Sequence, residues 1–397
     1  VKEVTFDQPD GTLTLFEHPE NVPRVEYDAA GNRLGLLVEE QRTNLITYSE
    51  DFSNSYWTKT NANVTAADYG YKITEDSSNG VHRIYALPTV SNSTDYSFSV
   101  YVKPAERTKA FIRFGGQNNV YAVVDLENGT VVEGSLTPTI TEAFDGFYKI
   151  SVTHTTTSTT FAPNIGPVAD SYTVTNGEPR YQGDGASGII AFGAQLEEAS
   201  FPTSYIKSNS GSTTTRSADV ASIPVADFGY NHNKGTVLVE FQQDFEYGGI
   251  VFPRVFEIGD PSTERVNVFI NENIGVLVAG AVFNNATQAV LTLKTETDGT
   301  VEATKVAFAF ADDDFAASDD GDTVAIDTSG SFSGGTPRTK LLLGSSNFCG
   351  HIKSIKYYPR RLTNAQLQAL TEPRSDATLS LTFDGLESSF TENYIHG

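Results

Sequence analysis

Two adjacent carboxylates, Glu39 and Glu40, are the first residues in the chain whose types could perform acid–base chemistry. Hydrolysis of a glycosidic bond needs two carboxyl groups that flank the same bond. Neighbouring residues of a strand point to opposite faces, so these two side chains are not expected to converge. We instead predict that Glu39 or Glu40 pairs with Arg42 and fixes the start of a strand.

Other catalytic constellations are missing from the sequence. It contains no H-E-x-x-H motif, no G-x-S-x-G elbow, no phosphate-binding P-loop and no G-x-G-x-x-G after a strand. The six histidines stand at no spacing typical of metal ligands. These residues are His18, His82, His154, His232, His351 and His396. We therefore expect no catalysis and no metal site formed by the histidines.

Sugar binding needs aromatic rings that stack on pyranose faces and polar side chains that donate and accept hydrogen bonds. Tyr101 alternates with the apolar residues around it and is expected on the opposite face of its strand, and Tyr121 follows a polar loop. The candidate carbohydrate-binding residues are Trp57, Tyr101, Arg113, Asn118 and Tyr121. The alternative for each aromatic residue is packing in a core or an interface.

Composition favours a β-rich protein of more than one domain. The chain has 397 residues with 19% charged and 11% aromatic side chains. A net charge of −23 and a pI near 4.5 oppose binding to nucleic acid or to an anionic membrane surface. No apolar run approaches the ~18 residues of a membrane span, and no signal peptide is visible. The single cysteine, Cys349, cannot form an intrachain disulfide.

Short alternating segments predict strands throughout the chain. Apolar residues alternate with polar or small ones at residues 96–102 and at residues 189–196, where Ile190, Phe192, Ala194 and Leu196 are predicted to share one face. Near the end, Thr363 and Gln366 form a capping-box pattern that predicts one short helix.

These patterns divide the chain into five parts. We predict an N-terminal adaptor of short hairpins (1–46), a first β-sandwich (47–207), a Ser/Thr linker (208–218), a second β-sandwich (219–373) and a C-terminal strand and tail (374–397). The chain begins at Val1 and contains no methionine, so we expect it to belong to a longer or processed protein.

Four stretches between about Arg24 and Thr371 resemble bacteriophage and prophage virion proteins in which a carbohydrate-binding-module-like jelly roll precedes a laminin-G/concanavalin-A-like lectin domain. They are RVEYDAAGNRLGLLVEEQRTNLITYSEDFSNSYWTKT, AFDGFYKISVT, AFGAQLEEASFPTSYI with TTTRSADVAS, and GHIKSIKYYPRRLTNAQLQALT. The resemblance implies an all-β fold of two consecutive antiparallel sandwiches, with the first domain as the jelly roll and the second as the lectin-like domain.

The resemblance draws attention to two further acidic groups. Glucanases of the concanavalin-A-like fold carry an E-x-D pair that this chain lacks, because Asp244 stands four residues after Glu240 and is followed by Glu246. The aspartates Asp319, Asp320 and Asp322 are weak candidates for calcium, although the EF-hand order is not met. In similar domains this region is a hairpin, so the alternative is a tight acidic turn with Gly321 at its tip.

We therefore expect a non-enzymatic virion surface protein, namely a tail fibre, spike or head fibre, that binds a host cell-surface glycan for host attachment. Its expected partners are that glycan, other virion proteins and further copies of itself, with a trimer favoured. No nucleic acid and no membrane insertion are expected. The alternatives are a structural protein that cements capsid or tail subunits, and a tailspike that degrades polysaccharide.

Overall fold

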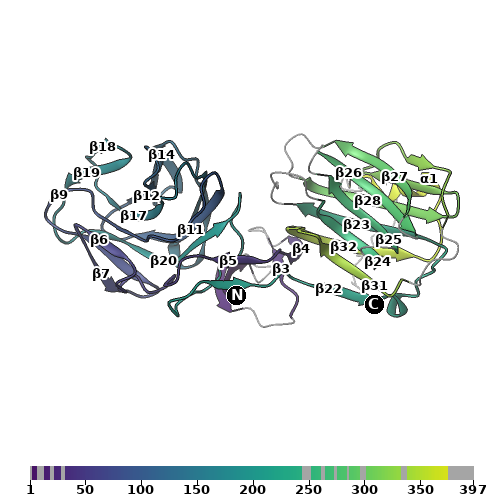
Figure 1. Cartoon of the computed structure of the whole chain (residues 1–397), viewed down its shortest axis with the longest axis horizontal. Coiled ribbons are helices and arrows are strands. Elements are labelled where there is room, and N and C mark those ends of the chain that lie inside the picture. Colours follow the sequence, from purple (N-terminus) through teal and green to yellow (C-terminus); the bar gives the residue numbers. More distant parts are fainter. Residues whose placement is uncertain are drawn as a thin grey trace, which may run out of the picture.

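The computed structural model describes residues 2–6, 13–17, 22–27, 32–243, 252–260, 264–271, 275–283, 286–295, 301–331 and 338–373. Two antiparallel β-sandwiches lie side by side along the long axis of the molecule (Figure 1). Within the described residues there is one α-helix, α1 (Asn364–Thr371), besides the short 3₁₀ turns Phe144–Gly146 and Val225–Phe228. The all-β prediction is confirmed.

The first sandwich packs two six-stranded sheets face to face. One sheet has the order β14 (Thr130–Gly134), β13 (Tyr121–Asp125), β12 (Lys109–Gly115), β17 (Ala162–Val168), β10 (Arg83–Tyr85) and β6 (Thr58–Thr60). The other has the order β15 (Thr139–Glu142), β16 (Tyr148–Thr155), β11 (Asp95–Pro104), β20 (Gly188–Glu198), β8 (Tyr71–Glu75) and β7 (Ala62–Ala66). A small sheet of β18 (Thr173–Thr175), β19 (Glu178–Gln182) and β9 (Asn79–Gly80) adds to this unit.

The alternation in β11 places its side chains as predicted. Tyr96 and Phe98 face the core between the sheets, whereas Tyr101 lies in a separate aromatic cluster outside it. In β20 the prediction of one continuous face is wrong. Residues Ile190 and Phe192 face outward, but Ala194 and Leu196 face the core.

Gly193 causes this exchange of faces. Its φ of +63° lies in the left-handed region, and the pairing of β20 with β11 shifts register beside it. A Cβ at this position would lie 3.0 Å from the Tyr101 ring. A glycine bulge therefore turns the strand, which alternation alone cannot reveal.

The second sandwich packs a nine-stranded sheet on a six-stranded one. The larger has the order β2 (Leu13–Glu17), β1 (Lys2–Phe6), β3 (Val25–Tyr27), β4 (Arg33–Val38), β32 (Gly350–Tyr358), β23 (Lys234–Gln243), β28 (Val301–Ala311), β29 (Phe315–Asp319) and β30 (Ala325–Asp327). The smaller has the order β22 (Ala221–Pro224), β31 (Lys340–Ser345), β24 (Arg254–Asp260), β25 (Glu264–Asn271), β26 (Val276–Phe283) and β27 (Ala286–Thr295).

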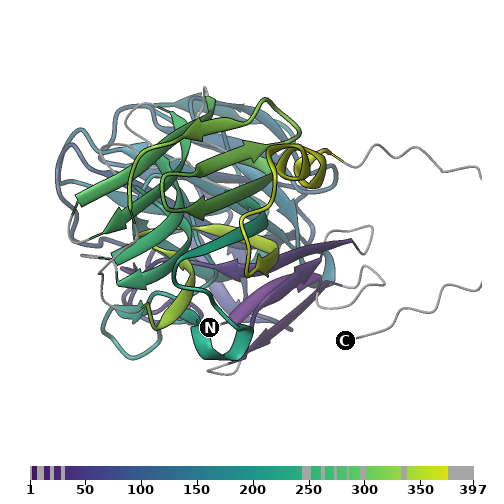
Figure 2. The ribbon, with the colours of Figure 1, turned by 90° about the vertical axis from the view of Figure 1, so that its right-hand side faces the viewer.

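The N-terminal segment is not the separate adaptor that was predicted. Strand β4 pairs with β32, with Leu36 opposite Ile352, so residues from the start of the chain extend a sheet built largely from its end. Figure 2 shows these purple strands beside the green strands of the second sandwich. The first sandwich is thus inserted between two parts of the second.

The predicted Ser/Thr linker also contains ordered structure. Strand β21 (Thr214–Arg216) pairs with β5 (Arg42–Asn44), and the hydroxyls of Thr43 and Thr215 lie 2.8 Å apart. Ser208 is buried. The two passages of chain between the sandwiches therefore form a hydrogen-bonded ribbon, which restricts their relative motion more than a flexible linker would.

The predicted helix forms as its capping pattern indicated. Thr363 is the N-cap of α1 and completes a capping box with Gln366. Leu362 and Leu367 are buried together against β28 and β29. The strand predicted within 374–397 lies outside the described residues.

Candidate functional site

A row of five side chains crosses the outer face of the first sandwich. Cross-strand pairs join Tyr121 to Arg113, Arg113 to Asn164, Asn164 to Tyr85, and Tyr85 to Thr58. Directly paired residues of a sheet project to the same face. We call these five residues the transverse row.

The residues next to the transverse row in sequence confirm its direction. Ile112, Ile165 and Ile84 belong to the core between the two sheets. Alternate residues of a strand face opposite sides, so the transverse row faces away from that core. It combines two tyrosines with a guanidinium, an amide and a hydroxyl; Tyr85, Arg113 and Thr58 reach the surface, and Tyr121 and Asn164 are buried.

Three arginines meet one carboxylate on the same face. Arg83 Nη1 lies 2.6 Å and Arg113 Nη1 3.4 Å from Glu178 Oε1, and Arg180 Nη2 lies 2.6 Å from Glu178 Oε2. We call Arg83, Arg113, Arg180 and Glu178 the arginine cluster. Its groups come from β10, β12 and β19, and Arg113 also donates to the backbone oxygen of Asn176 at 3.2 Å.

The arginine cluster is locally positive in an acidic protein. Three guanidinium groups surround one carboxylate, while the whole chain carries a net charge of −23. Burial lowers the pKa of Arg113, Glu178 opposes this, and the nearby charges of Arg83 and Arg180 add to the lowering. The Nε atoms of Arg83 and Arg113 have no hydrogen-bond partner within the described part of the chain. Acceptors are therefore scarce around these guanidiniums.

The structure brings together three of the five residues predicted to bind carbohydrate. Arg113 and Tyr121 are cross-strand partners, and Asn118 is exposed in the turn that connects their strands. Tyr121 is 8% exposed and packs in a buried cluster with Phe111 and Val123, so its ring is not open for stacking. Its hydroxyl donates to Glu133 at 3.3 Å. These residues occupy one end of the transverse row.

Trp57 and Tyr101 are not placed for sugar stacking, which corrects the prediction for both. Trp57 is 1% exposed, its ring packs edge-on against Phe52, and its indole N–H donates to the Tyr48 carbonyl. Tyr101 is 2% exposed beneath Phe144 and neighbouring rings. A buried ring presents no face to a ligand, so the packing alternative holds for both residues.

The aspartates considered for calcium form a turn. Asp320 accepts the Lys305 amide at 2.9 Å, and Gly321 has a φ of +83° at the tip. Burial, reinforced by the charges of Asp320 and Asp322, raises the pKa of Asp319 to about 6. Among the described residues, no group of three or more His, Cys, Asp or Glu side chains is arranged to hold a metal ion. The acidic-turn alternative therefore fits this hairpin.

The other carboxylates singled out by sequence have structural partners or cannot be placed. Glu240 lies 3.1 Å from Lys353, whereas Asp244 and Glu246 lie outside the described residues. Glu40 pairs with Arg42 at 2.5 Å, as predicted for that strand entry.

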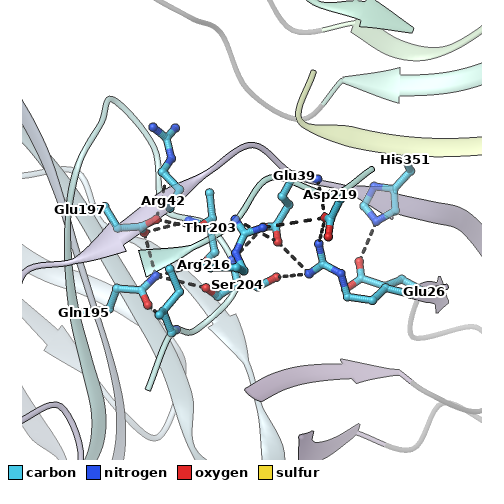
Figure 3. Close-up of polar contacts among 12 residues, drawn as sticks. Glu26, Glu39, Arg42, Gln195, Glu197, Thr203, Ser204, Arg216, Asp219 and His351 are labelled. Atoms are coloured by element: carbon cyan, nitrogen blue, oxygen red, sulfur yellow. Dashed lines mark hydrogen bonds and ion pairs between the residues drawn. The ribbon is translucent and has the colours of Figure 1, made fainter. Parts of the chain in front are cut away.

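Glu39 belongs to a buried network between the two sandwiches (Figure 3). Arg24 Nη1 lies 2.7 Å from Glu39 Oε2, the Ser204 amide donates to Glu39 Oε1 at 2.8 Å, and the Asp219 carboxylate accepts from the Glu39 amide at 2.9 Å. Arg216 lies 3.5 Å from Glu39 Oε2. We call Arg24, Glu39, Ser204, Arg216 and Asp219 the junction network.

The junction network controls the charge state of Glu39. Burial alone would raise the pKa of this carboxyl, but the charges of Arg216 and Arg24 and hydrogen bonds from Ser204 and Arg24 outweigh it and lower the pKa to about 2. Glu39 is therefore fixed as an anion, which suits a structural contact and not a proton-transfer group.

A second buried carboxylate lies beside the junction network (Figure 3). Glu197 Oε2 accepts from the Thr203 amide at 2.9 Å and from Gln195 Nε2 at 2.8 Å. Burial raises the pKa of Glu197 despite these bonds and the nearby charge of Arg42. Glu197 thus ties the last strand of the first sandwich to the segment that leads into the ribbon.

An open hollow of about 570 Å³ adjoins the junction network and is lined partly by Arg42, Asp219 and Lys340. Its aromatic lining residue, Phe348, is buried in the core of the second sandwich. The hollow therefore lacks an exposed ring for sugar stacking, unlike the transverse row, where Tyr85 is half-buried.

Sequence inspection missed Arg83, Tyr85, Asn164, Glu178 and Arg180. The alternation Arg83-Ile84-Tyr85 could have indicated that the side chains of Arg83 and Tyr85 share the outward face of one strand. The neighbours of that strand could not be found, because β10 pairs with β17 and not with the next strand in the chain.

No protein-family model matches this chain. No curated protein matches it either. Among solved structures, the Ruminococcus gnavus IT-sialidase CBM40 bound to α2,6-sialyllactose is 15% identical, covers 38% of this chain and 93% of its own, and has a TM-score of 0.31. Domains LG4–5 of the mouse laminin α1 chain are 10% identical, with coverage of 73% and 90% and a TM-score of 0.25.

A third similar structure is Trypanosoma rangeli sialidase in complex with the inhibitor DANA, which is 12% identical, covers 79% of this chain and 62% of its own, and has a TM-score of 0.30. Similarities at these scores do not identify a function. In the described part of the chain, no helix combines the length and hydrophobicity that a membrane span requires.

Proposed function

We propose that this protein is a non-enzymatic, glycan-binding surface protein of a phage or phage-like particle, and that it binds host-cell glycans through the transverse row. The observation that carries the proposal is the alignment of Tyr121, Arg113, Asn164, Tyr85 and Thr58 across five neighbouring strands of one outward face. Thr58 is exposed and Tyr85 and Arg113 are half-buried, so these three side chains offer a ring and hydrogen-bonding groups to a sugar, whereas Tyr121 and Asn164 are buried beside them.

The architecture supports a role in display. Two sandwiches joined by a paired ribbon and a buried ionic network hold the transverse row in a fixed orientation relative to the second sandwich. A single sugar site of this kind binds weakly, so several copies on one particle would supply the avidity. We propose that the chain acts as an oligomer, with a trimer favoured, and that it contacts other virion proteins.

The particle assignment is supported by the sequence resemblance to virion proteins, and the acidic surface suits a repeated soluble assembly. Within this proposal the chain lies on the virion surface, as part of a tail fibre, spike or head fibre.

A glycan array probed with the full chain tests the binding function. We expect binding to a subset of glycans, and we expect Tyr85→Ala to weaken it at least tenfold, since stacking on that ring is lost. Tyr69→Ala is the matched control: this tyrosine is 57% exposed in the same sandwich and packs edge-on against Phe144, away from the transverse row. Equal binding by Tyr85→Ala and wild type would contradict the proposed site.

The role on a particle needs a separate experiment. Deletion of the protein should reduce adsorption to host cells while particles remain intact. Broken particles would instead favour a cementing role, and release of reducing ends from host capsule by the purified chain would favour a degrading tailspike.

A further inference from the structure

We infer that the glycan bound by the transverse row is acidic, and that the arginine cluster recognises a carboxylate on the sugar, as in a uronic acid. This inference rests on the proposed glycan-binding function and specifies its ligand class. It follows from the side chains that surround Glu178 and from the composition of the row.

The arginine cluster already binds one carboxylate from three sides. Arg83 and Arg113 both approach Glu178 Oε1, while Arg180 approaches Glu178 Oε2. Each guanidinium carries five N–H donors, so one carboxylate uses only a minority of them. Arg180 has 46% of its side chain exposed and can present its remaining donors to a ligand.

The cluster has donors that the surrounding chain does not use. The Nε atoms of Arg83 and Arg113 are buried and have no hydrogen-bond partner among the residues that the structure describes. Arg180 is the member of the cluster that reaches solvent, with 46% of its side chain exposed. A second oxyanion bound there would accept hydrogen bonds from Arg180 and reduce the repulsion among the three guanidiniums.

The positive charge of the arginine cluster can attract an anion even though the whole protein is acidic. At physiological ionic strength the Debye length is about 8 Å, so distant surface carboxylates are largely screened at the cluster. Arginine is also the side chain whose planar donors match a carboxylate in two-point contacts. These features favour an acidic sugar over a neutral one, because a neutral sugar would leave the excess positive charge of the arginine cluster without a counter-charge.

Tyr85 and the arginine cluster are in direct contact. The Arg83 guanidinium lies over the Tyr85 ring, 5.2 Å from its centre, so a sugar would stack on the opposite face of that ring. In a uronic acid the carboxylate is attached directly to the pyranose ring, so a sugar stacked beside Tyr85 places its carboxylate near the arginines. A carboxylate therefore fits better than a charge carried on a long substituent.

The test measures binding of the full chain to immobilised polygalacturonate and to the same polymer after reduction of its carboxyl groups. We expect at least tenfold weaker binding to the reduced polymer. We also expect Arg180→Gln to weaken binding to polygalacturonate at least fivefold, with an unchanged melting temperature because Arg180 is half exposed. Lys109→Gln is the matched control, since it removes one positive charge from β12 at the exposed pair with Asp170.

The outcomes separate this inference from the proposed function. Equal binding to both polymers, or no effect of Arg180→Gln, would overturn the carboxylate assignment and leave glycan binding intact. Preference for a sulfated dextran over polygalacturonate, lost in Arg180→Gln, would overturn the carboxylate in favour of a sulfate ester. Failure of the chain to bind any glycan on the array would overturn both proposals.

Discussion

Replacement of Glu39 by glutamine tests how much the junction network contributes to stability. The carboxylate is 4% exposed, and its pKa is lowered from 4.5 to about 2 because Arg216, Arg24 and Ser204 outweigh the effect of burial. At about 1.4 kcal/mol per pH unit, this difference corresponds to about 3 kcal/mol of stabilisation at neutral pH. Removal of one partner of a buried ion pair costs about 3–5 kcal/mol in general, which agrees in order of magnitude.

The pH dependence has a defined sign. The folded-state pKa lies below the unfolded value, so the stabilisation is fully present above about pH 4.5 and disappears as the pH falls towards 2. Urea unfolding of wild type and Glu39→Gln between pH 2 and pH 8 measures both quantities. We expect a difference of about 3 kcal/mol at pH 7 that shrinks steadily below pH 4.5.

A matched control separates this effect from a general loss of negative charge. Glu106 pairs with Lys72 at 2.7 Å, but Glu106 is 53% exposed, so Glu106→Gln should change the unfolding free energy by less than about 1 kcal/mol. The reasoning is refuted if Glu39→Gln behaves like Glu106→Gln at pH 7, or if its difference from wild type is the same at pH 3 and pH 7.

Three further predictions concern other parts of the chain. Asp319→Asn should raise the free energy of unfolding by up to about 3 kcal/mol at pH 8 and have little effect near pH 4. The reason is that a buried carboxyl with a pKa raised to about 6 destabilises the fold only while it is ionised. An effect of the substitution that is the same at both pH values would contradict this. Gly193→Ala should lower the free energy of unfolding in urea by about 1 kcal/mol more than Gly146→Ala does. Both glycines have a positive φ, but a new Cβ lies 3.0 Å from the Tyr101 ring only at Gly193. Equal losses of stability would exclude the ring contact as a cause. Emission from Trp57, the single tryptophan, should be blue-shifted, poorly quenched by acrylamide and unchanged by saturating glycan, because its ring is 1% exposed; a ligand-induced shift would place the site near that ring.

The sequence by itself determined the features that depend on neighbours along the chain. Alternation in β11 separated Tyr96 and Phe98 from Tyr101, because successive side chains of a strand face opposite sides. The capping box of Thr363 and Gln366 specified the start of α1 through backbone hydrogen bonds within one turn. The all-β class followed from many such local signals.

Tertiary structure decided which distant segments meet. The N-terminal strand β4 joins β32, and the predicted linker pairs with β5, because unpaired strand edges and buried charges find partners that sequence order does not specify. The sequence also left the exposure of Trp57 open, because both packing and sugar binding suited its ring until its neighbours were placed.

The candidate site shows the same division. Arg113, Asn118 and Tyr121 come from one hairpin, so their proximity could be read from adjacent strands. Tyr85 and Glu178 reach the same face from strands that are distant in the sequence, through a sheet order that only packing of the complete sandwich fixes. Hairpin contacts are encoded locally, whereas the surface to which a ligand binds is produced by long-range strand pairing.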